Sequence, residues 1–128
     1  MSTKRVVFVS GSRLAQNLFE MIIRGIPRKI EFTAYDNLDA VAQAYFPNKV
    51  NLIILDQNCL SGDAGANLLT KAFVRGAFKT SKRMFVYSRN KVFDHEDLKQ
   101  NGFKYQYAKP FLPEELIVML SEHLGITV

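Results

Sequence analysis

Two short, uninterrupted apolar segments, each ending in polar residues, constrain the fold of this chain more than any other feature. Residues 5–10 contain VVFV and residues 51–56 contain LIIL. Continuous apolar runs of this length are typical of parallel strands that are buried on both faces. The alternating pattern of residues 30–35 indicates a less buried edge strand, and residues 82–88 and 104–108 indicate two more strands.

Helices are predicted between these strands, because apolar residues repeat there at spacings of three and four. In the first two helices the repeating residues are Leu14, Leu18, Phe19 and Ile22, followed by Leu38, Val41, Ala42 and Tyr45. Asp36 or Asn37 can cap the second helix, and Pro47 ends it. Residues 64–75 and 93–100 are expected to form two further helices. A last helix starts near Pro113 and closes at Gly125.

Strands that alternate with helices predict an α/β fold, in which a parallel sheet is covered by helices on both sides. The length of 128 residues fits a single domain spanning residues 1–128. The first apolar stretch, residues 6–9, is too short for a signal peptide or a membrane span. The expectation is therefore a cytoplasmic protein that does not enter a membrane.

The chain is basic, with a formal charge of +5, and its cations are unevenly distributed. No carboxylate occurs between Asp63 and Asp94, where the cations are Lys71, Arg75, Lys79, Lys82, Arg83, Arg89 and Lys91. Such a positive face attracts anionic partners. A solvated surface is the simpler interpretation, because no nucleic-acid recognition motif accompanies it. Binding of an anionic ligand or nucleic acid through Lys79, Lys82 and Arg83 remains an alternative.

Little in the sequence suggests an enzyme or a metalloprotein. Cys59 is the only cysteine, and His95 and His123, both expected to be exposed on helices, give no cluster at metal-ligand spacing. Neither a Gly-rich phosphate loop nor a Ser-His-Asp set is present. We therefore predict neither an enzyme nor a bound cofactor.

Polar residues gather where the strands are predicted to end, which is where parallel sheets place functional groups. These residues are Ser10-Gly11-Ser12, Asp56-Gln57-Asn58, Ser88-Arg89 and Lys109-Pro110. Their order, with Gly62-Asp63 before the third helix and Gly102 seven residues before Lys109, resembles the receiver domain of bacterial response regulators over residues 4–124. The resemblance implies a flavodoxin-like (βα)5 three-layer sandwich with a five-stranded parallel sheet in the order 2-1-3-4-5.

The resemblance also implies a role for each strand-end residue. Asp56 stands at the position of the phosphoryl acceptor, and Ser88 at that of the hydroxyl that binds the phosphoryl group. Lys109 would pair with both, with its bond to Pro110 in cis, and the carbonyl of Asn58 would help to hold magnesium. Phosphoryl transfer needs this combination because it depends on positioning and charge neutralisation. The alternative is that Asp56 only caps a turn and Ser88 satisfies backbone groups.

Three departures from the receiver pattern change this expectation. Ser10 and Gly11 stand where receivers have two carboxylates, so magnesium binding should be weak or absent. Gln106 replaces the aromatic switch residue. Arg89 follows Ser88 in place of a small residue, and we hypothesise that Arg89 or Arg13, together with Lys109, substitutes for the metal.

The sequence thus predicts a pseudo-receiver, meaning a protein-interaction module of two-component signalling that is not phosphorylated in the usual magnesium-dependent way. The alternative within the same family is a receiver that is phosphorylated inefficiently on Asp56. The expected partner is a signalling protein, and homodimerisation is left open. The predicted interaction face consists of Phe93, Leu98, Gln106, Tyr107, Phe111 and Glu115.

Overall fold

The computed structural model describes residues 3–59, 78–88, 95–100 and 102–126 of the 128-residue chain. Its strands are β1 (Lys4–Val9), β2 (Ile30–Tyr35), β3 (Leu52–Asp56), β4 (Lys82–Ser88) and β5 (Tyr105–Lys109). All neighbouring pairs are parallel, and the sheet order is β2-β1-β3-β4-β5. The predicted fold class and strand order are confirmed, with strand ends shifted by one residue at most.

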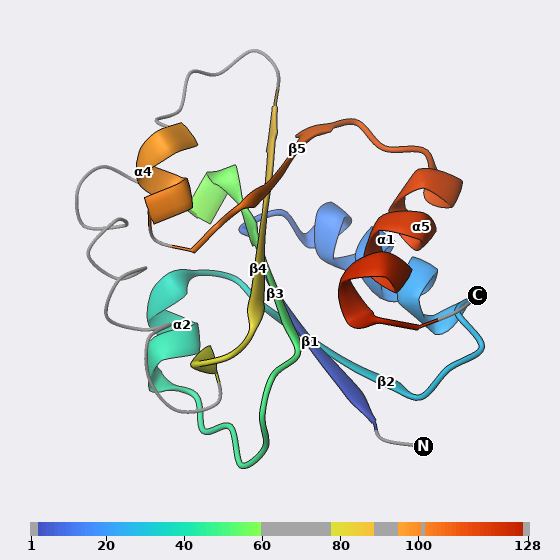
Figure 1. Cartoon of the computed structure of the whole chain (residues 1–128). Coiled ribbons are helices and arrows are strands. Elements are labelled where there is room, and N and C mark those ends of the chain that lie inside the picture. Colours follow the sequence, from blue (N-terminus) through green and yellow to red (C-terminus); the bar gives the residue numbers. More distant parts are fainter. Residues whose placement is uncertain (1–2, 60–77, 89–94, 101, 127–128) are drawn as a thin grey trace.

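Helices cover both faces of this sheet, as Figure 1 shows. α1 (Arg13–Arg24) and α5 (Pro113–Leu124) lie on one face, and α2 (Leu38–Gln43) and α4 (His95–Gln100) lie on the other. A short 3-10 turn, Gln57–Cys59, follows β3. The helix predicted for residues 64–75 lies outside the described residues, as does the predicted start of the fourth helix at Phe93. None of the described helices is long and apolar enough to cross a membrane.

Local capping explains where several helices begin and end. The Ser12 hydroxyl accepts a hydrogen bond from the backbone N–H of Ala15, and Asn37, not Asp36, caps α2 through Ala40. Gly125 ends α5 in the left-handed conformation, as the sequence predicted. α2 ends at Gln43, earlier than expected, so Tyr45 is 85% exposed and does not extend its buried face.

The predicted buried face of α1 was wrong in part. Leu14 and Leu18 are 81% and 42% exposed, whereas Phe19 and Ile22 are buried as expected. The buried stripe is Gln16, Phe19, Ile22 and Ile23. The side chain of Gln16 points inward, and its amide donates to the carbonyl of Ser10 at the end of β1. Gln16 shares the inner side of α1 with Phe19, Ile22 and Ile23, and its amide is paired there with the Ser10 carbonyl and with Asp36.

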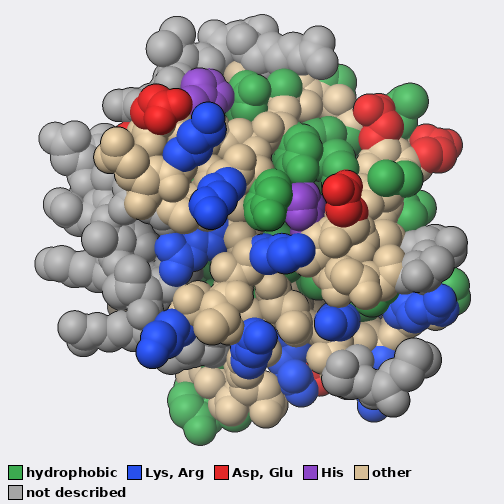
Figure 2. All heavy atoms as spheres, in the orientation of Figure 1, with side chains coloured by type: hydrophobic (Ala, Val, Ile, Leu, Met, Phe, Trp, Pro, Cys, Tyr) green, Lys and Arg blue, Asp and Glu red, His purple; other side chains and the backbone are tan. Residues whose placement is uncertain are grey.

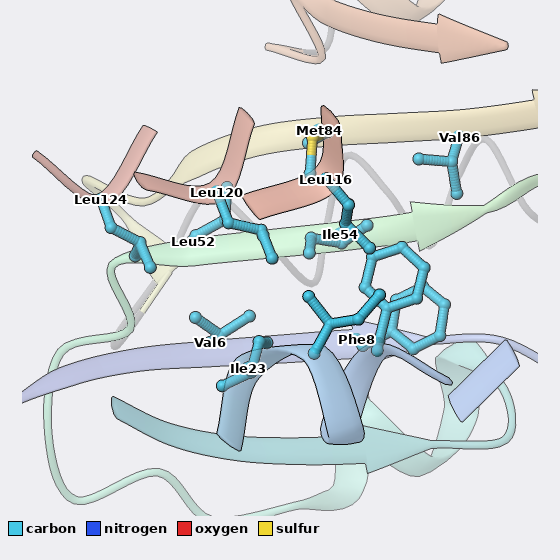
Figure 3. Packing of buried hydrophobic residues seen from close by; sticks show 12 residues of the cluster. Val6, Phe8, Ile23, Leu52, Ile54, Met84, Val86, Leu116, Leu120 and Leu124 are labelled. Carbon is cyan, nitrogen blue, oxygen red and sulfur yellow. The ribbon is translucent and has the colours of Figure 1, made fainter. Parts of the chain in front are cut away.

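The sheet separates two hydrophobic clusters, and β3 contributes to both because alternate residues of a strand point to opposite faces. Figure 3 shows the cluster between the sheet and α1 and α5, where Ile54 and Phe8 meet Leu116 and Leu120. The ring of Phe8 stacks on that of Phe19 at a centroid distance of 4.2 Å. This packing fixes the strand ends, and therefore the side chains that follow them, relative to one another.

Candidate functional site

Asp56, the last residue of β3, is the centre of the candidate site. Its side chain is 1% exposed, and both carboxylate oxygens are engaged. The ammonium nitrogen of Lys109 lies 2.9 Å from Oδ1 and 3.1 Å from Oδ2. The hydroxyl of Ser10 donates to Oδ2 at 3.1 Å. The structure therefore brings together three of the residues that the sequence singled out, from the ends of β1, β3 and β5.

Ser10 stands where receivers carry acidic residues, and its hydroxyl is the hub of a small network. Besides donating to Asp56, the Oγ atom accepts from the backbone N–H of Ser12 at 3.1 Å and lies 3.3 Å from the amide nitrogen of Asn58. The Asn58 Oδ1 atom accepts from the backbone N–H of Gly11 at 2.9 Å. The side chain of Asn58 was missed by the sequence analysis, which considered only its carbonyl. A neutral hydrogen-bonded network thus fills the place of two charges.

Gln16 is a second residue that sequence reasoning missed. It is 5% exposed, and its Nε2 atom donates to the Ser10 carbonyl at 2.7 Å and to Asp36 Oδ1 at 2.8 Å. Its spacing of three and seven residues from Phe19 and Ile23 places it on the buried stripe of α1, and that spacing was the available signal. Gln16 ties α1 to the ends of β1 and β2 beside the site.

Of the two arginines proposed as metal substitutes, only Arg13 lies in the described residues, and it does not approach Asp56 as expected. Arg13 is exposed, and its guanidinium lies 3.9 Å from Asp36, so it pairs with that carboxylate and not with Asp56. The reason is geometric. Arg13 is the first residue of α1, and Asp36 directly follows β2, the strand that pairs with β1. Arg89 lies outside the described residues, so its proposed contact with Asp56 stays a prediction.

Ser88 ends β4 directly beside Lys109, with which it pairs in the strand register. Its backbone N–H donates to the Oε1 atom of Gln57 at 2.5 Å, and Gln57 is buried. This bond joins the ends of β3 and β4. Ser88 is therefore in the predicted place, and the Lys109-Pro110 bond is cis as the resemblance implied.

The donor atoms at this site fit a magnesium ion poorly. Magnesium is usually held by one or two carboxylates together with phosphate oxygens and waters. At Asp56 there is one carboxylate, and an ammonium group and a hydroxyl already occupy its two oxygens. In the described part of the chain, His, Cys, Asp and Glu side chains form no group of three that could hold a metal.

Cys59 lies next to this network without being activated by it. Burial raises the pKa of its thiol to about 12, and the negative charge of Asp56 adds to this effect. Its sulfur lies 3.6 Å from Asn58 Oδ1. Because the thiolate is the reactive form, Cys59 is a poor nucleophile at neutral pH.

Gln106 joins β5 to α4 instead of acting as a rotating aromatic. Its Nε2 atom donates to the backbone carbonyls of His95 and Phe103, both at 3.0 Å, and its Oε1 atom contacts the ring nitrogen Nδ1 of His95. The ring of Tyr87 meets that of His95 edge-on. The position that switches in receivers is here tied into a polar contact between two elements.

The predicted interaction face is exposed only in part. Leu98 is 5% exposed and belongs to the core, so its inclusion was wrong: as an apolar residue on the inner side of α4, it packs against the sheet. Tyr107 and Phe111 are partly buried against the cluster below α5. Glu115 is exposed and its carboxylate caps the N–H of Leu112. Phe93 lies outside the described residues.

His123, predicted to be exposed, is only 6% exposed, because its spacing of seven and three residues from Leu116 and Leu120 puts it on the buried side of α5. Its Nε2 atom lies 2.7 Å from the hydroxyl of Tyr107, and its ring packs on Tyr105 at a centroid distance of 4.1 Å. Burial lowers the pKa of the imidazole, and the charge of Lys82 lowers it further. His95, by contrast, is exposed as predicted.

Two of the cations predicted to form one positive face, Lys82 and Arg83, lie on opposite sides of the sheet. Lys82 and Arg83 are consecutive residues of β4, so their side chains leave opposite faces. Lys82 points to the α5 side. Arg83 packs on Gly102, where burial lowers the pKa of its guanidinium. Lys71, Arg75, Arg89 and Lys91 lie outside the described residues.

Solved structures with the same fold cover nearly the whole chain. A response regulator receiver protein from Burkholderia phymatum aligns with a TM-score of 0.75 at 20% identity, covering 98% of each chain. The chemotaxis response regulator CheY4 of Vibrio cholerae aligns with a TM-score of 0.72 at 19% identity, over 96% of this chain and all of that one. The signal receiver domain of an HD domain-containing protein from Pseudomonas fluorescens gives 0.74 at 18% identity, over 97% and 96%.

These similarities establish that the chain has the fold of response-regulator receiver domains. At the level of sequence, no protein-family model and no curated protein matches it. The shared fold places the ends of β1, β3, β4 and β5 as the sequence resemblance anticipated.

Proposed function

We propose that this chain works as a pseudo-receiver, a signalling module that binds a protein partner without a magnesium-dependent cycle of phosphorylation on Asp56. The receiver fold is the premise of the proposal. The observation that carries it is the engagement of both Asp56 oxygens by Lys109 and Ser10. Side-chain hydrogen-bond donors of the chain itself, one of them charged, stabilise the buried carboxylate, so no divalent ion is required.

The neutral residues at the end of β1 support the same proposal. An attacking carboxylate and an incoming phosphoryl group are both negative, so their approach needs positive charge beyond one lysine. Around Asp56, the described part of the site offers the ammonium of Lys109 and the neutral donors of Ser10 and Asn58. Without an acidic pair to recruit magnesium, transfer to Asp56 should be slow or absent.

We expect the chain to act by binding a protein partner, because receivers with this fold belong to signalling proteins. The tie between Gln106 and His95 supports a surface that is held in one arrangement, since it fixes α4 against β5. We place the interaction face around α4, β5 and α5, as the sequence suggested, without Leu98. The competing function is a receiver that is phosphorylated inefficiently on Asp56.

The test is incubation of the purified chain with acetyl phosphate and magnesium, followed by intact-mass spectrometry. We expect no mass increase of one phosphoryl group beyond that of the Asp56→Asn control. NMR titration with beryllofluoride and magnesium should likewise leave the amides of Asp56, Ser88 and Lys109 unshifted. Efficient labelling that disappears in Asp56→Asn would replace the proposal by the phosphorylated-receiver alternative.

A gain-of-function variant makes this test sharper. The double substitution Ser10→Asp with Gly11→Asp supplies an acidic pair after β1, and a Cβ atom at Gly11 would meet nothing closer than 3.8 Å. We expect this variant to bind magnesium and to be labelled by acetyl phosphate faster than the parent chain. A variant that folds but gains neither property would show that the acidic pair is not what limits the site.

A further inference from the structure

A second polar site lies at the opposite end of the sheet from Asp56. A shallow pocket of about 200 Å³ opens where strands begin, and its lining residues are Lys4, Lys49, Asn51, Thr80, Lys82, His123, Leu124 and Gly125. Lys4 and Lys82 are the first residues of β1 and β4, whereas Asp56 is the last of β3. The two sites are therefore separated by the length of a strand, roughly 15 Å.

Within the described residues, no carboxylate forms an ion pair with the lysines of this pocket. Lys4, Lys49 and Lys82 form no ion pair with any carboxylate in residues 3–59, 78–88, 95–100 and 102–126. Like charges that line one pocket repel each other, and a bound anion relieves that repulsion. In Figure 2, Lys and Arg side chains gather over the lower half of the face drawn. Glu122, the neighbour of His123, does not line the pocket.

Neutral donors complete the set that an oxyanion needs. The Oδ1 atom of Asn51 accepts from the N–H of Arg5 at 2.8 Å, so the amide is oriented, and its Nδ2 atom has no partner among the described residues. Thr80 adds a hydroxyl at the rim. His123 forms part of the wall, and its Nε2 atom is held by Tyr107, which fixes the ring. Ammonium, amide and hydroxyl groups together are typical ligands of phosphate oxygens.

We propose that this pocket binds the phosphate group of a small phosphorylated molecule, held by the ammonium groups of Lys4, Lys49 and Lys82. The size of the pocket favours a small anion, because sites for drug-sized ligands usually exceed roughly 300 Å³. The proposal goes beyond the pseudo-receiver function and does not depend on it, since no residue of the pocket belongs to the Asp56 site. Ligand binding here would give the module an input other than phosphorylation.

The probe for this site is inorganic pyrophosphate, titrated into the ¹⁵N-labelled chain in a buffer free of phosphate. We expect saturable shifts at Asn51, Thr80, Lys82 and Gly125 and none at Asp56. The His123 ring signals should report a rise of its pKa on binding, because a nearby anion favours the protonated imidazole. Increasing salt should weaken binding.

Matched lysine variants separate a built site from general attraction to a basic protein. Lys82→Gln should weaken pyrophosphate binding by about ten-fold, because it removes one of the three ammonium groups that hold the anion. Lys104→Gln removes the same charge from an exposed lysine that does not line the pocket, and it should leave the affinity unchanged within two-fold or so. Equal losses in both variants, or shifts that never saturate, would overturn the proposal.

Two further measurements identify the source of the phosphate. Vesicles of phosphatidylcholine containing phosphatidic acid should sediment no more of the chain than vesicles of phosphatidylcholine alone. Duplex DNA should compete with pyrophosphate only weakly. Binding to the acidic vesicles or to DNA without any binding of pyrophosphate would contradict a small-molecule site. Retained binding in Asp56→Asn would show that this pocket is independent of the signalling site.

Discussion

The ammonium group of Lys109 contacts both oxygens of Asp56, at 2.9 and 3.1 Å, across the ends of β3 and β5. The carboxylate is 1% exposed, whereas the lysine side chain is 32% exposed. The lysine therefore keeps contact with water while it neutralises a buried charge. This asymmetry determines what the loss of either partner should do.

Removal of Lys109 should destabilise the fold more than removal of Asp56. Lys109→Gln leaves the buried carboxylate without its cation, which costs about 3 kcal/mol in comparable pairs. Asp56→Asn leaves a lysine that can turn to water, so the cost should be nearer 1 kcal/mol. Urea denaturation of both single variants and of the double variant measures this. A double variant that is no more stable than Lys109→Gln would contradict an unpaired Asp56 as the cause.

Gln106 should control the local stability of α4. Gln106→Ala removes two hydrogen bonds to the carbonyls of His95 and Phe103. We expect amide hydrogen exchange within α4 to accelerate roughly ten-fold, as the loss of about 1.4 kcal/mol implies. Lys104→Ala, an exposed change next to β5, is the control and should not alter it. Equal acceleration in α4 and α5 would indicate global destabilisation instead.

The buried His123 should make stability depend on pH. Its pKa is lowered in the folded state, mainly by burial, so below the unfolded value of about 6.5 the unfolded chain binds a proton that the folded chain does not. The free energy of unfolding should therefore fall as the pH falls from 7 toward 5. The slope from this group cannot exceed about 1.4 kcal/mol per pH unit.

The variant His123→Gln tests this prediction, because it removes the buried imidazole and keeps the exposed His95. It should flatten the dependence of urea-unfolding free energy on pH between 7 and 5, although it is less stable at pH 7 because Tyr107 loses its partner. The other charged groups facing the ring, Lys82 and Glu122, stay in place. An unchanged slope would mean that a different group carries the pH dependence.

Cys59 should react slowly with alkylating reagents while the chain is folded. Its pKa of about 12, raised by burial and by Asp56, leaves about a thousand-fold less thiolate at pH 8 than the ordinary value of 9.0. Iodoacetamide labelling followed by mass spectrometry, with and without urea, checks this. Asp56→Asn removes one of the two main causes and should speed labelling. Equal rates in folded and unfolded chain would show that the thiol is not protected.

The order of elements and the strand-end residues followed from sequence because they depend on local patterns. Continuous apolar runs predicted β1 and β3, and the resemblance to receiver domains implied that the side chains of Asp56 and Lys109 meet. Local patterns were insufficient to predict which side of the amphipathic helix α1 is buried. The spacing grouped Leu14 and Leu18 with Phe19 and Ile22, and it did not show that α1 packs on the sheet through Gln16, Phe19, Ile22 and Ile23.

By itself the sequence determined the strands of the sheet and the absence of an acidic pair after the first of them, because apolar periodicity and residue identity carry that information directly, whereas the strand order came from the resemblance to receiver domains. The tertiary structure decided which polar groups replace that pair. Ser10 lies 46 residues from Asp56 and 48 from Asn58 along the chain, and only the packing of β1 beside β3 brings the Ser10 hydroxyl to Asp56. It also decided that Lys4, Lys49 and Lys82 share a pocket, since long-range strand pairing, and not sequence proximity, brings their charges together.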